Sequence, residues 1–207
     1  MSQTPPQPAG KVRPGSVSLA VWLQILLAVF LLAQTVVSFV YGADAGAAAE
    51  DALEAQGVAV SDLPQGTTFE PGVGALAFNV VLAVGLLLLA AFNGAGKRPA
   101  RIITWIVQPI ILLCTLAGLA STLFMTQFLT YAFENSGDPT LEALDVEAIV
   151  DAVTGAYPAW TAVLSWGALV LGVLGSLLVI ILLAVPSANA FFRKEEPEKY
   201  IPGAPEA

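Results

Sequence analysis

Residues 93–101 read NGAGKRPAR and separate two long apolar segments, VGALAFNVVLAVGLLLLAAF (73–92) and IITWIVQPIILLCTLAGLASTLFMTQFLTY (102–131). A helix needs roughly 20 apolar residues to cross the hydrocarbon core of a bilayer, which is about 30 Å thick. Two further segments qualify, at 17–41 and 159–185. None of the four contains Asp, Glu, Lys or Arg, which are costly in the middle of a bilayer. The sequence therefore predicts an all-α membrane protein, a bundle of four transmembrane helices.

The composition of the chain agrees with this class. The 207 residues are 57% hydrophobic and 12% charged, with a mean hydropathy of +0.78, whereas soluble domains carry about 25% charged residues. His is absent and Cys114 is the single cysteine, which excludes an intrachain disulfide and the usual zinc motifs. We therefore expect no cofactor or metal. Abundant Ala, Gly and Val with little Lys indicate a high-GC bacterial source.

The charges are segregated along the chain. The connections 42–72 and 132–158 contain no basic residue and hold six acids each. Short loops rich in Lys and Arg stay on the cytoplasmic side of a membrane. The pattern therefore predicts a multi-pass protein of the bacterial plasma membrane with both termini in the cytoplasm. The eight basic residues lie in the two tails and the middle loop: Lys11, Arg13, Lys97, Arg98, Arg101, Arg193, Lys194 and Lys199.

Basic residues next to the spans are interpreted as topology determinants that also contact phospholipid head groups, each contact being worth about 1 kcal/mol near an anionic surface. Nucleic-acid binding is disfavoured because the middle loop is short and lies against the membrane. The first span is interpreted as a retained signal-anchor, since its apolar core is longer than that of a signal peptide. The residues assigned to topology and head-group contact are Lys97, Arg98, Arg101, Arg193 and Lys194.

The segments outside the membrane differ in their expected order. The membrane domain is predicted over 16–193, with a disordered tail at 1–15 and a flexible tail at 194–207. AGAAAEDALEAQG (45–57) is rich in Ala and is expected to be helical. In the second acidic connection, Asp138 is a plausible N-cap that precedes Pro139. The acids lack the spacing of a calcium loop and are interpreted as a solvated surface, although cation binding is left open.

Small residues recur at intervals of four within the spans, which places them on one helix face. Helices in lipid associate through such ridges. We expect the ridges to pack inside the chain, with a dimer seam as the alternative. The packing residues assigned in this way are Ala168, Gly172 and Ser176 in the fourth span and Gly118 and Thr122 in the third.

Amide side chains within the spans have two interpretations. They can cross-link helices, or they can line a path for a solute. Cross-linking is preferred because a proton- or ion-coupled transporter normally needs a buried ionisable group in its spans. The amides considered as a path are Gln24, Asn79, Gln108 and Gln127, with Gln34 as a further intramembrane amide.

Two residues of the third span carry separate expectations. Pro109 should kink the helix, and the neighbouring Gln108 is expected to supply the missing hydrogen bond. Cys114 is expected to be buried among apolar residues and therefore inert. Without His, and with acids only outside the spans, no nucleophile–base pair can be drawn, so an enzyme is not expected.

PSANAFFR (186–193) follows the fourth span, with Pro186 at the helix exit and Phe191 and Phe192 expected to dip into the membrane interface. With the four-span architecture of residues 16–193, this motif resembles small uncharacterised four-pass membrane proteins of actinobacteria. The resemblance implies the architecture and no activity. The leading hypothesis is a non-enzymatic accessory or scaffold protein that binds membrane lipids and another membrane protein or a second copy of itself. The alternative is a small transporter or channel subunit.

Overall fold

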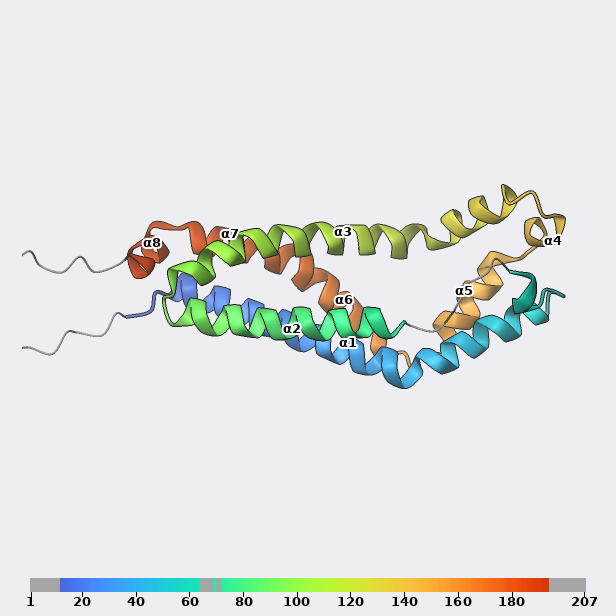
Figure 1. The fold of residues 1–207 in the computed structure, drawn as a ribbon, viewed down its shortest axis with the longest axis horizontal. Helices are drawn as coiled ribbons and strands as arrows, with labels where there is room; N and C mark the ends of the chain where they lie inside the picture. The colour runs from blue at the N-terminus through green and yellow to red at the C-terminus, as the bar shows by residue number, and fades with distance from the viewer. Residues whose placement is uncertain (1–11, 64–68, 70–71, 194–207) are drawn as a thin grey trace, which may run out of the picture.

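The computed structural model describes residues 12–63, 69 and 72–193, and every regular element among them is helical (Figure 1). The predicted all-α four-helix membrane architecture is confirmed. Four helical stretches are long and apolar enough to cross a membrane: α1 (Gly15–Glu54), α2 (Val73–Gly94), α3 (Arg98–Glu134) and a continuous run of α6 (Thr161–Val170), η2 (Leu171–Gly175) and α7 (Ser176–Ala184). Short elements complete the fold: η1 (Val60–Asp62), α4 (Pro139–Glu142), α5 (Val146–Gly155) and α8 (Pro186–Phe192).

The helices run antiparallel, so the start of α1, the turn between α2 and α3, and α8 lie at one end of the molecule (Figure 1). This end holds Arg13, Lys97, Arg98, Arg101 and Arg193, and it is called the basic end below. The opposite end holds residues 42–63 and 132–158 and is called the acidic end. Most of the tails expected to lack structure (1–11 and 194–207), including Lys194, lie outside the described residues.

α1 is much longer than the predicted first span. Its 40 residues correspond to a length of about 60 Å, roughly twice the thickness of the hydrocarbon core. The Ala-rich stretch is helical, as expected, and continues the span without a break, because Ala favours helix and Ala45, Ala49 and Leu53 are buried on the inner face of the extension. α1 therefore joins the membrane bundle to the acidic end as one element.

The acidic end has its own small core. Leu53 and Val58 from the end of α1 and the following turn pack with Leu63, Leu141 and Ile149. The side chain of Gln56 ties the two acidic connections together, because its Oε1 accepts a hydrogen bond from Asp145 N at 2.6 Å and its Nε2 donates to Asp145 O at 3.2 Å. The two acidic connections thus form one packed unit.

The predicted N-cap of the second acidic connection is present. Asp138 precedes Pro139 at the start of α4, and its Oδ1 accepts a hydrogen bond from Thr140 N at 2.9 Å. This backbone hydrogen bond stabilises the charged carboxylate and lowers the pKa of Asp138 below its ordinary value. Asp145 caps α5 in the same way, through Ala148 N at 3.1 Å.

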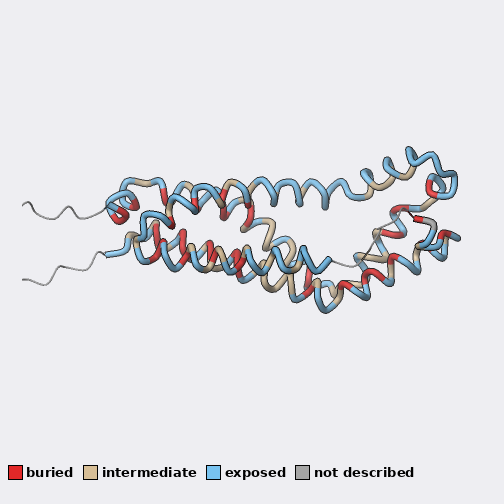
Figure 2. The backbone as a smooth tube through the Cα atoms, viewed as in Figure 1, coloured by how far each residue is buried: buried red, intermediate tan, exposed pale blue. Residues whose placement is uncertain are grey.

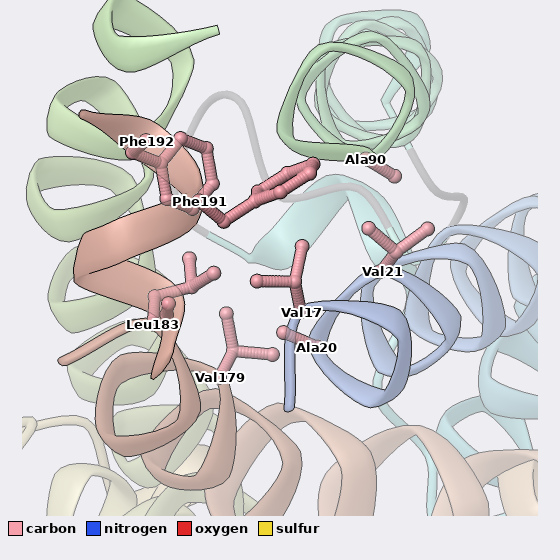
Figure 3. Packing of buried hydrophobic residues seen from close by; sticks show 9 residues of the cluster. Val17, Ala20, Val21, Ala90, Val179, Leu183, Phe191 and Phe192 are labelled. Atoms are coloured by element: carbon pink, nitrogen blue, oxygen red, sulfur yellow. The ribbon is translucent and has the colours of Figure 1, made fainter. Parts of the chain in front are cut away.

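The basic end is closed by α8 (Figure 3). Phe191 and Phe192 are buried with Val17 of α1, Ala90 of α2 and Leu183 of α7. The prediction that both phenylalanines dip into the membrane interface is therefore wrong: α8 turns back over the bundle after Pro186 and directs both rings inward. The turn before α3 has a glycine where it contacts this packing. A Cβ at Gly96 (φ +71°) would lie 3.1 Å from the ring of Phe191, so a larger residue would crowd the ring.

The fourth span contains a π-helical turn, η2, at the place where it crosses α3. Gly172 and Gly175 in this turn are buried, as is Ser176 after it. A Cβ at Gly172 would lie 2.6 Å from Oγ1 and 2.7 Å from Cγ2 of Thr115 on α3. Of the predicted ridge, Gly172 and Ser176 thus lie in the helix contact, while Ala168 is half-buried.

Gly172→Ala should destabilise the bundle by about 1–3 kcal/mol, because the added methyl group overlaps a branched side chain in a packed contact. Gly118→Ala is the matched control on α3, since a Cβ there meets nothing within 4 Å, and its effect should stay within about 0.5 kcal/mol. Reversible unfolding of both variants in bicelles measures the difference. Equal stability of the two variants would contradict the close approach of α3 and η2.

Candidate functional site

The basic half of the bundle encloses a cluster of buried polar side chains from three helices. Asn93 of α2 uses its Nδ2 to donate to Gln24 Oε1 of α1 at 3.2 Å and to Thr104 Oγ1 of α3 at 2.8 Å. Thr104 Oγ1 in turn donates to Ala100 O at 2.8 Å. All three side chains are fully buried, so the cluster cross-links the helices in a medium that offers no competing water.

A second buried pair lies nearer the middle of the bundle. Ser176 Oγ of α7 donates to Gln108 Oε1 of α3 at 3.4 Å. The prediction that Gln108 satisfies the backbone vacancy created by Pro109 is wrong, because the side chain turns away from its own helix toward the fourth span. Some buried polar atoms of the two groups have no partner among the described residues: Gln24 Nε2, Asn93 Oδ1 and Gln108 Nε2.

Beyond these contacts, α3 separates from the other helices. Figure 1 shows α6 crossing away from α3 toward α1, and Figure 2 shows α3 exposed along most of its course toward the acidic end. The space between them is a cleft with two connected parts, which share Gln34, Asn79, Thr122, Ser165 and Trp166 as lining residues. The inner part has a volume of about 470 Å³ and the outer part about 600 Å³.

The lining of the cleft changes along its depth. The inner part is bounded by Leu27, Leu82 and Ile111 near the middle of the spans, whereas the outer part reaches Tyr157 and Pro158 at the acidic end. Between them lies a belt of amide and hydroxyl groups contributed by all four spans: Gln34, Asn79, Thr122 and Ser165. Apolar side chains therefore line the deep end, and polar side chains line the part nearer the acidic end.

Within this belt the hydrogen bonds are incomplete. Gln34 Nε2 donates to Ser165 Oγ at 3.2 Å, and Ser165 Oγ donates to Thr161 O at 3.2 Å. Thr122 Oγ1 donates to Gly118 O of its own helix at 2.9 Å. Asn79 is half-buried, and its amide has no hydrogen-bond partner in the described part of the chain. An amide in this position has hydrogen-bonding capacity left for a bound molecule.

The structure separates the four amides that were considered as a path. Gln24 and Gln108 belong to buried pairs, Asn79 lines the cleft, and Gln127 is exposed on α3. They therefore do not line one continuous channel.

Two further expectations for α3 need correction. Gly118 and Thr122 were assigned to helix packing, but both are exposed and line the cleft, because α6 tilts away from this part of α3. Cys114 is likewise exposed rather than buried, and it lines the inner part of the cleft. The spacing of four residues placed these side chains on one face correctly, but the sequence carries no signal for the tilt of the opposing helix.

Of the five basic residues assigned to topology, the four that the structure describes lie together at the basic end. Lys97, Arg98 and Arg193 are exposed. Arg101 has an additional structural role: its guanidinium lies 4.5 Å from the ring centroid of Trp105 and donates a hydrogen bond to Asn189 Oδ1 of α8. Arg101 therefore helps to hold α8 across the end of the bundle.

Comparison of the chain with protein-family models, with curated proteins and with solved structures found no match in any of the three. The class defined by the fold is a multi-pass α-helical membrane protein, and its resemblance to actinobacterial four-pass proteins stays a prediction.

Asn93→Leu should lower the stability of the bundle by about 1 kcal/mol, because it removes both cross-links from α2 and leaves Thr104 and Gln24 with fewer partners. Asn79→Leu makes the same change of side chain in the same helix, at a site without such bonds. It should leave stability unchanged or raise it. Thermal unfolding in detergent, monitored by size-exclusion chromatography, compares the stability of the two variants. A larger loss of stability for Asn79→Leu than for Asn93→Leu would show that the buried cluster is not what holds α2 to α1 and α3.

Proposed function

We propose that this protein is a non-enzymatic accessory protein of the bacterial plasma membrane that binds another membrane component in the cleft between α3 and α6. One observation carries the proposal: the bundle leaves polar side chains of all four spans facing a space that it does not fill. In hydrocarbon, amides and hydroxyls are stabilised by hydrogen-bonding partners. A bound membrane component supplies those partners.

The charge distribution supports a defined orientation. The basic end carries Arg and Lys, while the acidic connections contain neither. By the positive-inside rule, the basic end lies in the cytoplasm together with both termini, and the acidic end faces outward. The cleft then opens toward the outer leaflet.

Single cysteines introduced into a Cys114→Ser background test this orientation. Ser136→Cys at the acidic end should react with an impermeant maleimide in intact cells. Ala95→Cys in the turn between α2 and α3 should react only after the cells are permeabilised, because positive loops stay inside. The opposite pattern of labelling would reverse the orientation.

The binding role is tested by purifying the tagged full-length chain from gently solubilised native membranes and identifying what co-purifies. Gly118→Phe fills the cleft without an initial clash, since no atom lies within 4 Å of a Cβ at this position. Ala120→Phe is the matched control, because Ala120 is exposed at the same depth of α3 on the opposite face. A stoichiometric component retained by Ala120→Phe and lost from Gly118→Phe supports the proposal. Equal recovery from both variants rejects the cleft as its site.

A small transporter or channel subunit is the second candidate, and the reach of the cleft to Tyr157 and Pro158 favours it. The two functions differ in whether water fills the cleft. A charged methanethiosulfonate reagent reacts with thiolates in water, so it should modify Cys114 in liposomes if the cleft is an aqueous vestibule and leave it intact if a membrane component occupies the cleft. Since Cys114 is the single cysteine, labelling reports on the cleft directly.

A further inference from the structure

We infer that the occupant of the cleft is an uncharged lipid with a free hydroxyl group, of the diacylglycerol class, with one acyl chain in the inner part and its glycerol end at the polar belt. This inference rests on the proposed function and names the membrane component. The shape of the cleft, its polarity along the depth and its uncharged lining carry the inference.

The shape of the cleft favours a lipid over a protein helix. A volume of about 470 Å³ for the inner part lies in the range of small-molecule sites, which is about 300–1,000 Å³. A transmembrane helix is about 10 Å across with its side chains and would need far more space. The wall of the cleft on α2 is continuous with the outer surface of the bundle, because Phe78, which is exposed, and Leu82 line both the inner part and an apolar groove between α2 and α3.

The polarity of the lining matches the direction of a lipid in the leaflet next to the acidic end. The deep end is bounded by Leu27 and Ile111, which suit the end of an acyl chain. Gln34, Asn79 and Ser165 lie closer to the acidic end and offer hydrogen-bond donors and acceptors. A lipid of the neighbouring leaflet places its chain end and its oxygen atoms in this same order along the depth.

The charges select the head group. Connections 42–72 and 132–158 contain twelve acids, six in each, and no Lys or Arg. Neither part of the cleft is lined by Arg or Lys, so a phosphate group would find no basic partner there. A hydroxyl group needs no basic partner, and it can donate to the amide oxygen or accept from the amide nitrogen of Asn79, which is free of other bonds within the described residues.

The test uses the purified full-length protein in phosphatidylethanolamine liposomes that contain a photoactivatable, alkyne-tagged diacylglycerol. After irradiation, cross-linked peptides are identified by mass spectrometry. A phosphatidylglycerol probe with the same photoactivatable chain is used in parallel. Unlabelled diacylglycerol is added as a competitor, so that a saturable site is separated from the lipid that surrounds any membrane protein.

The expected result is labelling of the α1, α2, α3 and α6 segments that line the cleft, suppressed by the competitor and stronger for diacylglycerol than for phosphatidylglycerol. Gly118→Phe should reduce this labelling about tenfold, equivalent to about 1.4 kcal/mol, while Ala120→Phe should leave it unchanged. Asn79→Leu, which leaves the packing intact, should reduce the preference for diacylglycerol over phosphatidylglycerol.

Other results overturn the inference. Labelling that the competitor does not suppress, or that is equal in Gly118→Phe and Ala120→Phe, means that the cleft holds surrounding lipid only. Equal labelling by phosphatidylglycerol rejects the head-group class. If diacylglycerol does not label the cleft, but a protein co-purifies with the unmodified chain and is lost from Gly118→Phe, the lipid inference is wrong and the accessory function stands. If no component depends on Gly118 in either experiment, both are wrong.

Discussion

Asn93 is the residue on which the packed half of this bundle depends, because the two hydrogens of its side-chain amide reach Gln24 on α1 and Thr104 on α3. Lipid supplies no hydrophobic force between helices, so buried hydrogen bonds and close packing must hold them together. Both are concentrated in the basic half, where the amide cluster lies beside the core closed by α8. Toward the acidic end no equivalent cross-link joins α3 to α2 among the described residues, and α3 separates from its neighbours.

The contrast between the two halves follows from where small and polar residues meet across helices. At the crossing of η2 and α3, Gly172 allows Thr115 to approach closely and Ser176 pairs with Gln108. One turn further along α3, Gly118 is equally small but faces an open space. A small residue permits close packing and does not by itself cause it. The cleft therefore begins where the fourth span no longer presents a matching surface to α3.

The elements could be predicted from the sequence, whereas their tilt could not. Long apolar segments without charges defined the four spans, and Asp138 before Pro139 defined a helix start, because both signals are local. The intramembrane amides were recognised as candidates, but the pairing of Gln24 with Asn93 depends on the register between helices, and Asn93 was missed because it lies in the turn-like sequence NGAGK. Cys114, Gly118 and Thr122 were assigned to an interior because spacing gives the face of a helix and not its neighbour. The π-helical turn left no recognisable pattern in LGVLG (171–175).

The continuity of α1 also has a mechanical consequence. Each turn of a helix about 60 Å long is fixed to the next by backbone hydrogen bonds, so the two ends of α1 stay connected through regular backbone. Val17 of α1 is clamped at the basic end against α8, and Gln56, just beyond its last turn, is bonded to Asp145 at the other. The packed unit at the acidic end is therefore tied to the bundle by an unbroken helix rather than by a loop, and Figure 1 shows that this helix bends where it leaves the bundle.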